Sequence, residues 1–216
     1  MVWGIVEVVL RKAQDIMCCL ESSWRPNMKT RVEMDFQDSA PEILHRMWNE
    51  GVLCTVVDED GKQNLLTLGW GLIGRSYHDH PILTIAVTPL RYSWRFLEQV
   101  PEFVIAVPDD ALREATALCG TRSGRDLDKI RAAGLTPVPS VQVRAPSILE
   151  CPINVECRIY TRIVPPHMLL TPEHRRRPVK EQHTIYFAEV LGVYGWRMDG
   201  TPLGKPSTLN WDERLP

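Results

Sequence analysis

Three adjacent residues, Arg91, Tyr92 and Ser93, place a cation, an aromatic ring and a hydroxyl side by side, directly after an apolar run at Ile82–Thr88. A guanidinium and a hydroxyl can bind an anionic group, and an aromatic ring can pack against a flat one. At the mouth of a small barrel, such a group predicts a site for a flat anionic ligand. The alternative is that Arg91 is only a surface charge and Ser93 only a helix cap.

A second segment with similar chemistry is Ser123–Arg125, which we expect to open a helix. The amides at the start of a helix can form an anion-binding nest. Arg125 and Lys129 would lie one turn apart on this helix and add positive charge. The alternative is that they pair with Asp126 or Asp128 at the surface, which is worth only ~0.3–0.5 kcal/mol.

The elements that must position these residues read mainly as strands. Val52–Val57 is apolar and β-branched, Asp58–Gly61 supplies turn residues, and a second apolar run starts at Leu65, which together predict a β-hairpin. Ile82–Thr88 predicts a third strand and Glu102–Val107 a fourth. Later strands are expected at Val141–Val143, within Ile148–Val164, and at His183–Val193.

Short helices are expected between these strands. A capping-box pattern at Ser39–Glu42 predicts a helix that Gly51 ends, and Ser93 can cap a second. Asp109 can cap a third helix, Ala111–Cys119, closed by Gly120. Pro165–Glu181 holds four prolines and the run Arg175–Arg177, so it reads as an exposed loop. The pattern therefore indicates a mainly β fold, a β-barrel with short flanking helices.

The bulk composition is that of an ordinary globular protein. The 216 residues are 44% hydrophobic and 24% charged, with a net charge of −2. A net charge this close to zero argues against a protein that binds nucleic acid through a broad basic surface. No apolar run approaches the ~20 residues that span a bilayer, so no membrane partner is expected.

The cysteines and the chain ends guide the remaining expectations. None of the six cysteines forms a Cys-x-x-Cys pair, so no metal site is predicted. With no signal peptide visible, we expect a cytoplasmic protein. Residues 1–30 read as an N-terminal appendage, either an amphipathic helix over Val6–Leu20 or a poorly ordered extension. Residues 31–198 would form the barrel domain, and 199–216 a C-terminal tail.

The run Cys119–Lys129, Cys-Gly-Thr-Arg-Ser-Gly-Arg-Asp-Leu-Asp-Lys, is followed by Gly134–Ser140 and resembles the flavin reductase-like family. More narrowly, it resembles the flavoredoxin-type branch, whose fold is an FMN-binding split β-barrel. The resemblance extends over Val52 to about Val193, with the sequence blocks in the same order. It implies noncovalent FMN at a homodimer interface.

The resemblance also implies roles for particular residues. Backbone groups from Asn64 to Trp70 would bind the pyrimidine edge, with Gly69 allowing close approach, although a plain strand with a bulge at Gly69 is the alternative. Arg91 and Ser93 would bind the phosphate, and Cys119 would line the site without thiol chemistry. The expected cofactor-binding residues are Asn64, Thr67, Leu68, Gly69, Trp70, Ser76, Arg91, Tyr92, Ser93, Cys119, Ser123, Gly124, Arg125, Lys129 and His183.

The implied function is an FMN-dependent oxidoreductase that passes electrons from NAD(P)H or a protein donor to a small acceptor. The cofactor would perform the chemistry while the protein positions and tunes it, so no catalytic acid or base is expected. Two alternatives stay open. One is a flavoredoxin-like electron carrier without nicotinamide activity, and the other is a barrel that has lost flavin and acts as a ligand-binding or interaction module.

Overall fold

The structure is a computed structural model that describes residues 29–76, 80–167, 170–175 and 178–198. The chain divides into two compact units, and the larger of them contains Arg31–Trp196. Apart from Lys29 and Thr30, the predicted N-terminal appendage lies outside the described residues. The predicted C-terminal tail lies outside them entirely, so both stay predictions.

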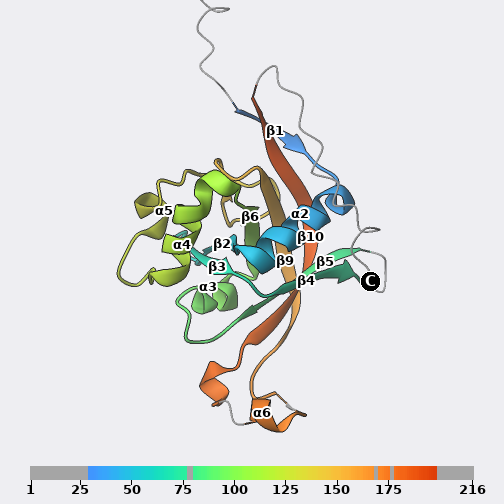
Figure 1. The fold of residues 1–216 in the computed structure, drawn as a ribbon, viewed down its shortest axis with the longest axis vertical. Coiled ribbons are helices and arrows are strands. Elements are labelled where there is room, and N and C mark those ends of the chain that lie inside the picture. Colours follow the sequence, from blue (N-terminus) through green and yellow to red (C-terminus); the bar gives the residue numbers. More distant parts are fainter. Residues whose placement is uncertain (1–28, 77–79, 168–169, 176–177, 199–216) are drawn as a thin grey trace, which may run out of the picture. The chain divides into compact units, whose positions relative to one another are not determined.

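An antiparallel sheet with the strand order β3-β2-β6-β9-β10-β5-β4 forms the body of the protein (Figure 1). A separate pair, β7 with β8, lies off this sheet, and β1 leads into Met34, whose amide donates to the Val193 carbonyl 2.8 Å away. This confirms the mainly β fold class. The strands are β1 (Lys29–Glu33), β2 (Val52–Val57), β3 (Gln63–Leu68), β4 (Gly71–Arg75), β5 (Pro81–Val87), β6 (Glu102–Val107), β7 (Pro137–Val138), β8 (Ser147–Ile148), β9 (Ile153–Ile163) and β10 (Thr184–Met198).

The helices are short, and in Figure 1 those that precede β7 occupy two positions, whereas α6 (Pro172–Arg175) lies at the lower end of the picture. The longest, α2, crosses a face of the sheet, whereas α3, α4 and α5 contact β2 and β3. The helices are α2 (Phe36–Asn49), α3 (Trp94–Gln99), the 3-10 turn η1 (Asp110–Leu112), α4 (Arg113–Thr121), α5 (Lys129–Ala132), α6 (Pro172–Arg175) and the 3-10 turn η2 (Val179–Glu181). The predicted loop at Pro165–Glu181 therefore contains two helical turns.

Helix α2 begins earlier than its sequence pattern predicts. The Asp35 carboxylate accepts from the amides of Gln37 (2.7 Å) and Asp38 (3.1 Å), so Asp35 is the N-cap and the predicted capping role of Ser39 is wrong. The Ser39 hydroxyl lies inside the helix and donates to the Asp35 carbonyl (2.7 Å). A carboxylate is the stronger acceptor and lies nearer the first free amides.

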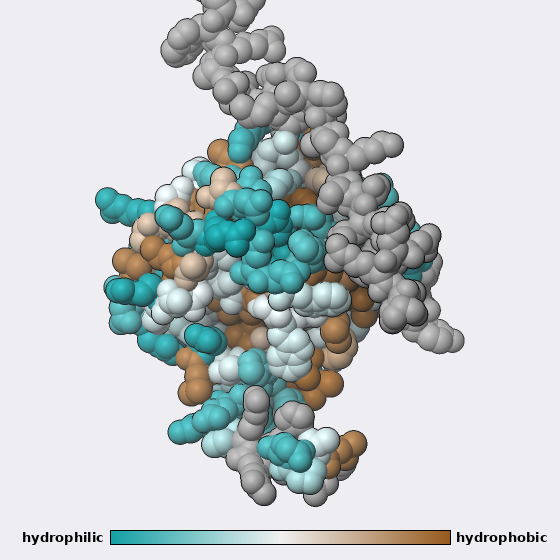
Figure 2. Space-filling model, in the orientation of Figure 1, coloured by the Kyte–Doolittle hydropathy of each residue, from teal (hydrophilic) through white to brown (hydrophobic). Residues whose placement is uncertain are grey.

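The amphipathic pattern of α2 places it on the sheet. Ile43 and Met47 are fully buried in the main core together with Phe96, Phe103 and Tyr186. Figure 2 shows a largely hydrophilic surface in the middle of this face, where α2 crosses the sheet, with apolar patches around it. This helix therefore closes one side of the core and exposes its polar side.

Two predicted strands, β2 and β6, have the predicted bounds, whereas β4 was not predicted. The hairpin turn holds Gly61 at φ +85°, a conformation that suits glycine. Strand β4 gives little sequence signal because it contains two glycines and only two apolar residues. A Cβ at Gly71 would lie 2.5 Å from the Met47 Sδ and 2.8 Å from the Thr84 carbonyl oxygen, so only glycine fits where α2 crosses this strand.

The predicted strand Val141–Val143 is wrong, because a buried carboxylate takes the hydrogen bonds that a strand partner would have made. Glu156 in β9 is fully buried and accepts from the amides of Val141 (2.8 Å) and Gln142 (2.6 Å). Asn154, also fully buried, accepts from the Ile148 amide (2.8 Å). The buried polar side chains of β9 thus hold the loop that precedes it.

Candidate functional site

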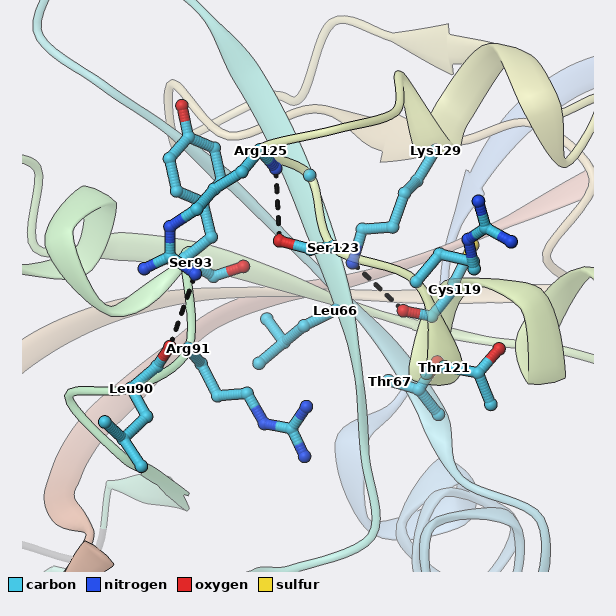
Figure 3. A pocket seen from close by; sticks show the side chains of 14 residues that line it. Leu66, Thr67, Leu90, Arg91, Ser93, Cys119, Thr121, Ser123, Arg125 and Lys129 are labelled. Atoms are coloured by element: carbon cyan, nitrogen blue, oxygen red, sulfur yellow. Dashed lines mark hydrogen bonds between the residues drawn. The ribbon is translucent and has the colours of Figure 1, made fainter. Parts of the chain in front are cut away.

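A pocket opens where β3, the turn after β5 and the segment joining α4 to α5 meet (Figure 3). It encloses about 160 Å³, below the roughly 300–1,000 Å³ of a complete small-molecule site. It therefore suits one end of a larger ligand, such as a phosphate with its linking chain. Its lining residues are Leu66, Thr67, Leu90–Ser93, Cys119–Arg125 and Lys129.

The pocket is strongly positive. Arg91, Arg122, Arg125 and Lys129 all line it, and no aspartate or glutamate among the described residues does. None of these four cations forms an ion pair with a carboxylate in the part of the chain that the structure describes. Figure 3 shows Arg91, Arg125 and Lys129 arranged around this opening. The arrangement suits a ligand with one or more negative charges.

Lys129 is the most unusual of these cations because it is only 5% exposed. Its ammonium donates to the Cys119 carbonyl oxygen at 3.0 Å. Burial lowers the pKa of Lys129, and the charge of Arg91 lowers it further against an opposing effect from Cys119. A buried ammonium without a counter-ion is costly, so a bound anion would offset part of that cost.

Cys119 contributes to the pocket through its backbone carbonyl and not through its thiol. Its side chain is 1% exposed, and burial raises the pKa of the thiol to about 11, with Lys129 opposing the rise. The thiol is therefore neutral near pH 7 and a poor nucleophile. It lines the pocket, and its chemistry is that of a packing residue.

The predicted helix at Ser123–Arg125 is wrong, and this segment is a turn. The Ser123 carbonyl accepts from the amides of Asp126 (3.2 Å) and Leu127 (3.2 Å), and its hydroxyl accepts from the Arg125 amide (3.2 Å). Helix α5 begins only at Lys129. Arg125 and Lys129 are therefore not one turn apart on a helix, yet both line the pocket.

Asn64 and Gly124 join this turn to the barrel. The Asn64 amide group donates to the Ser93 hydroxyl at 2.8 Å. Ser93 is the N-cap residue of α3, as predicted, but its side chain makes no cap hydrogen bond to the helix. A Cβ at Gly124 would overlap the Asn64 Oδ1. Gly124 is thus required for the turn to pack against Asn64.

Three cationic side chains contact the ring of Tyr92, so this ring is already packed against other groups. The Arg95 and Arg125 guanidinium carbons lie 4.1 Å and 5.2 Å from its ring centroid, and the Lys62 Nζ lies at 5.5 Å. Its hydroxyl accepts from Lys62 (3.1 Å) and from Arg95. Its ring also meets Phe96 edge to face. Tyr92 therefore anchors a cluster of positive side chains at the rim.

Of the expected site residues, nine line this pocket: Thr67, Arg91, Tyr92, Ser93, Cys119, Ser123, Gly124, Arg125 and Lys129. The Thr67 hydroxyl already donates to the Thr116 carbonyl (2.8 Å), so it fixes α4 against β3.

The other six expected residues do not line the pocket: Asn64, Leu68, Gly69, Trp70, Ser76 and His183. Leu68 is a core residue, and the Ser76 hydroxyl accepts from the His80 amide (3.2 Å). The rings of Trp70 and His183 meet edge to face with centroids 5.0 Å apart, and Trp70 is 48% exposed.

Five lining residues were not predicted: Leu66, Leu90, Gly120, Thr121 and Arg122. Gly120, Thr121 and Arg122 lie within the Cys119–Lys129 run, so its cation at Arg122 was a usable signal. The prediction that Gly120 closes α4 is wrong; a Cβ there would come within 3.2 Å of the Thr67 Cβ, so this glycine lets the helix pack on β3. Leu66 and Leu90 are apolar, so their side chains do not indicate an anion-binding site in the sequence.

Within the described ranges, no group of three or more His, Cys, Asp or Glu side chains could hold a metal ion. In the same ranges, no helix has both the length and the apolar character needed to cross a bilayer.

The sequence and the fold both match known proteins. A family model described as "Flavin reductase like domain" matches residues 44–214, most of the chain. The chain belongs to the flavin reductase-like family. An uncharacterised protein of Archaeoglobus fulgidus is 34% identical over 167 residues, which cover 71% of this chain and 85% of that protein.

Solved structures of the family share the fold. Flavoredoxin of Desulfovibrio vulgaris (Miyazaki F) matches with a TM-score of 0.55 and 23% identity, covering 71% of this chain and 72% of that one. The FMN-binding domain of a flavin reductase-like enzyme from Shewanella baltica matches with a TM-score of 0.55 and 17% identity, covering 81% and 86%. These matches, together with the antiparallel sheet, confirm the predicted split-barrel fold class.

Proposed function

We propose that this flavin reductase-like protein is an FMN-dependent oxidoreductase. The observation that carries the proposal is the buried ammonium of Lys129, which faces no carboxylate of the described residues in a pocket lined by three arginines. A dianionic phosphate is the ligand chemistry that such a set of donors binds best. The same set would have little purpose in a barrel without a cofactor.

The residues of the pocket fit the phosphate end of FMN. The Arg91 and Arg125 guanidiniums, the Lys129 ammonium and the Ser123 turn would hold the phosphate. The pocket is too small for the whole cofactor, so the flavin ring would extend beyond it. Bound FMN would supply the redox chemistry, which is to take electrons from a donor and pass them to an acceptor.

The absorption spectrum of the purified protein, followed by titration of the FMN-free protein with FMN, tests the cofactor. Arg91→Ala should weaken binding by about 1.5–3 kcal/mol, on the order of 10- to 100-fold in Kd. Arg113→Ala is the matched control, because its side chain is 63% exposed and contacts Glu50 and Asp110 instead. A colourless protein that FMN does not bind, or an unchanged Kd for Arg91→Ala, would remove this proposal.

We further propose NADH or NADPH as the electron source. Rapid mixing of the FMN-loaded protein with either nucleotide should bleach the flavin absorption band. Failure with both nucleotides, combined with bleaching by a reduced iron–sulfur protein, would identify an electron carrier in place of a nicotinamide-dependent enzyme.

We propose that the protein works as a homodimer. Strand β4 ends the sheet path, and two exposed apolar side chains flank or belong to it, Trp70 (48% exposed) and Leu72 (59% exposed). Trp48 on the adjoining α2 is 58% exposed. Apolar surface of this kind on a sheet edge suits a protein interface. Leu72→Glu should shift the molecular mass in solution from dimer to monomer, as measured by light scattering, and a monomeric wild-type protein would refute the dimer.

A cytoplasmic location is likewise a proposal. Its support is that Cys54, Cys119 and Cys157 are buried and form no disulfide. Unpaired thiols are typical of a reducing compartment. Detection of the native protein in a cell fraction other than the cytoplasm would contradict this.

A further inference from the structure

The positive surface at the mouth of the pocket extends beyond the pocket itself. Five cationic side chains there are exposed to solvent, and none of them forms an ion pair with a carboxylate of the described residues. They are Lys62, Arg91, Arg95, Arg122 and Arg125, and together they are called the basic rim. The whole chain carries a net charge of −2, so the basic rim is opposite in sign to the protein as a whole.

The members of the basic rim are neighbours in space. Three of them line the pocket, and the Tyr92 ring joins one of these, Arg125, to the other two. The Arg95 guanidinium carbon lies 4.1 Å from the centroid of this ring, and the Lys62 Nζ lies 5.5 Å from it. Neither Lys62 nor Arg95 lines the pocket, so the positive surface continues past the space that a phosphate would fill.

The side chains of the basic rim are held in place by the protein itself. Arg95 donates a hydrogen bond to the Tyr92 hydroxyl, and Lys62 donates to the same hydroxyl at 3.1 Å. The Arg125 Nη1 donates to the Leu90 carbonyl oxygen at 3.4 Å. Side chains that are fixed in this way lose less conformational entropy when a partner binds. The basic rim is therefore pre-organised for an interface.

Leu90 adds an exposed apolar side chain to this surface. It is 54% exposed, and Figure 3 shows its side chain and that of Arg91 projecting from the same turn. A phosphate gains nothing from a leucine side chain. Apolar contact area combined with arginine and tyrosine is typical of the centre of a protein interface. The surface therefore fits a protein better than it fits a small anion.

We propose that the basic rim is the docking surface for an acidic redox protein, with Leu90 at the centre of the contact. This inference rests on the proposed function, because the partner must receive electrons from FMN in the adjoining pocket. Two molecules of a one-electron partner are each reduced by one electron, the reduced flavin is oxidised by two electrons, and the protons it releases pass to water. Complementary charge accelerates the encounter and orients the partner.

Anaerobic stopped-flow mixing tests the docking surface. The FMN-loaded protein is reduced photochemically and mixed with oxidised cytochrome b5, an acidic one-electron protein, or with cytochrome c, a basic one. The rate constant for reduction of cytochrome b5 should fall about tenfold when added salt screens the charges, because attraction between the two proteins is lost. Reduction of cytochrome c should not slow, because salt only weakens its repulsion from the basic rim.

Two double variants with the same net charge locate the effect. Lys62→Ala/Arg95→Ala should lower the rate constant for cytochrome b5 at low salt about tenfold and remove most of its salt dependence. Arg113→Ala/Lys180→Ala removes two exposed cations outside the basic rim and should leave that rate constant unchanged. The Kd for FMN and the melting temperature should change little in both variants.

Leu90→Ser tests the apolar part of the contact without changing any charge. The cytochrome b5 concentration that gives half the maximal rate should rise about fivefold, as expected when an apolar contact at an interface is lost. The Kd for FMN, measured on the same variant, shows whether the pocket is intact. An unchanged half-saturating concentration would overturn the central place of Leu90.

The proposal is overturned if the two cytochromes respond to salt in the same way, or if the two double variants react equally with cytochrome b5. It is also overturned if Lys62→Ala/Arg95→Ala loses binding to phosphatidylserine vesicles while its cytochrome rates are those of the wild type, because the basic rim would then bind a lipid surface. Failure of the wild-type protein to bind FMN is a separate readout and refutes the proposed function instead.

Discussion

The ammonium nitrogen of Lys129 lies 3.0 Å from the carbonyl oxygen of Cys119, and this hydrogen bond holds an almost fully buried cation in the wall of the pocket. The neutral carbonyl accepts a hydrogen bond from one of the three N–H groups of the ammonium. It does not neutralise the positive charge. The positive charge is therefore available to a bound anion. In the protein without ligand, the same charge lowers the free energy of unfolding.

Lys129→Met tests this relationship, because methionine keeps most of the side-chain volume and removes the charge. The Kd for FMN should rise at least tenfold, about 1.4 kcal/mol. The free energy of unfolding of the FMN-free protein, measured with urea, should stay the same or increase, because a buried unpaired charge is lost. A lower stability with unchanged FMN affinity would mean that the lysine only supports the fold.

The lowered pKa of Lys129 makes stability depend on pH. Between that lowered pKa and the ordinary 10.5, the unfolded chain binds more protons than the folded one, so the stability of the FMN-free protein should rise with pH. Below the lowered pKa both states are protonated, and this contribution has no slope. Urea unfolding across the alkaline range should show the rise in the wild type and a smaller one in Lys129→Met.

FMN affinity should follow the opposite trend with pH. The ammonium attracts the phosphate only while it is protonated, so the Kd should increase as the pH rises through the pKa of Lys129. The Lys129→Met variant is the control and should lack this step. An equal step in both proteins would assign the pH dependence to another group.

The buried thiols should be unreactive in the folded protein. Burial raises the pKa of Cys119 to about 11 and also raises those of Cys54 and Cys157. Because the thiolate is the reactive form, a colorimetric thiol reagent should modify these three residues near pH 7 only after denaturation. Rapid labelling of Cys119 in the native protein, identified by peptide mapping, would contradict this and reopen a thiol role.

Gly124→Ala should damage the pocket through packing alone. The new Cβ would collide with the Asn64 side chain, so the turn or Asn64 must move, at a cost of about 1–3 kcal/mol in stability. Because Asn64 also holds Ser93, the Kd for FMN should rise as well.

Gly74→Ala is the matched control for Gly124→Ala. Its Cβ would meet only Ile82 side-chain atoms at 3.8–4.0 Å, an ordinary contact. Both stability and FMN affinity should change little. Equal effects of the two substitutions would show that the glycine positions do not differ in the way the packing indicates.

The strands that the sequence predicts best are those whose signal is local. Val52–Val57 and Glu102–Val107 are mostly apolar runs bounded by turn residues or proline, and they form β2 and β6 with the predicted bounds. Strand β4 lacks such a run, because Gly71 is selected by the space beneath α2 and not by strand propensity. Val141–Val143 has strand composition, but the Glu156 carboxylate competes for its amides.

The candidate site also has some features that the sequence predicts and others that only the tertiary structure decides. The sequence by itself determined the run from Cys119 to Lys129 and the Arg91–Ser93 group, because each is a contiguous set of residues with recognisable chemistry. Only the tertiary structure decided that these two segments share one pocket, that Lys129 is buried without a carboxylate of the described residues beside it, and that Trp70 and His183 lie outside the pocket lining. Those features depend on contacts between residues far apart in the chain, and burial and charge pairing exist only once such contacts have formed.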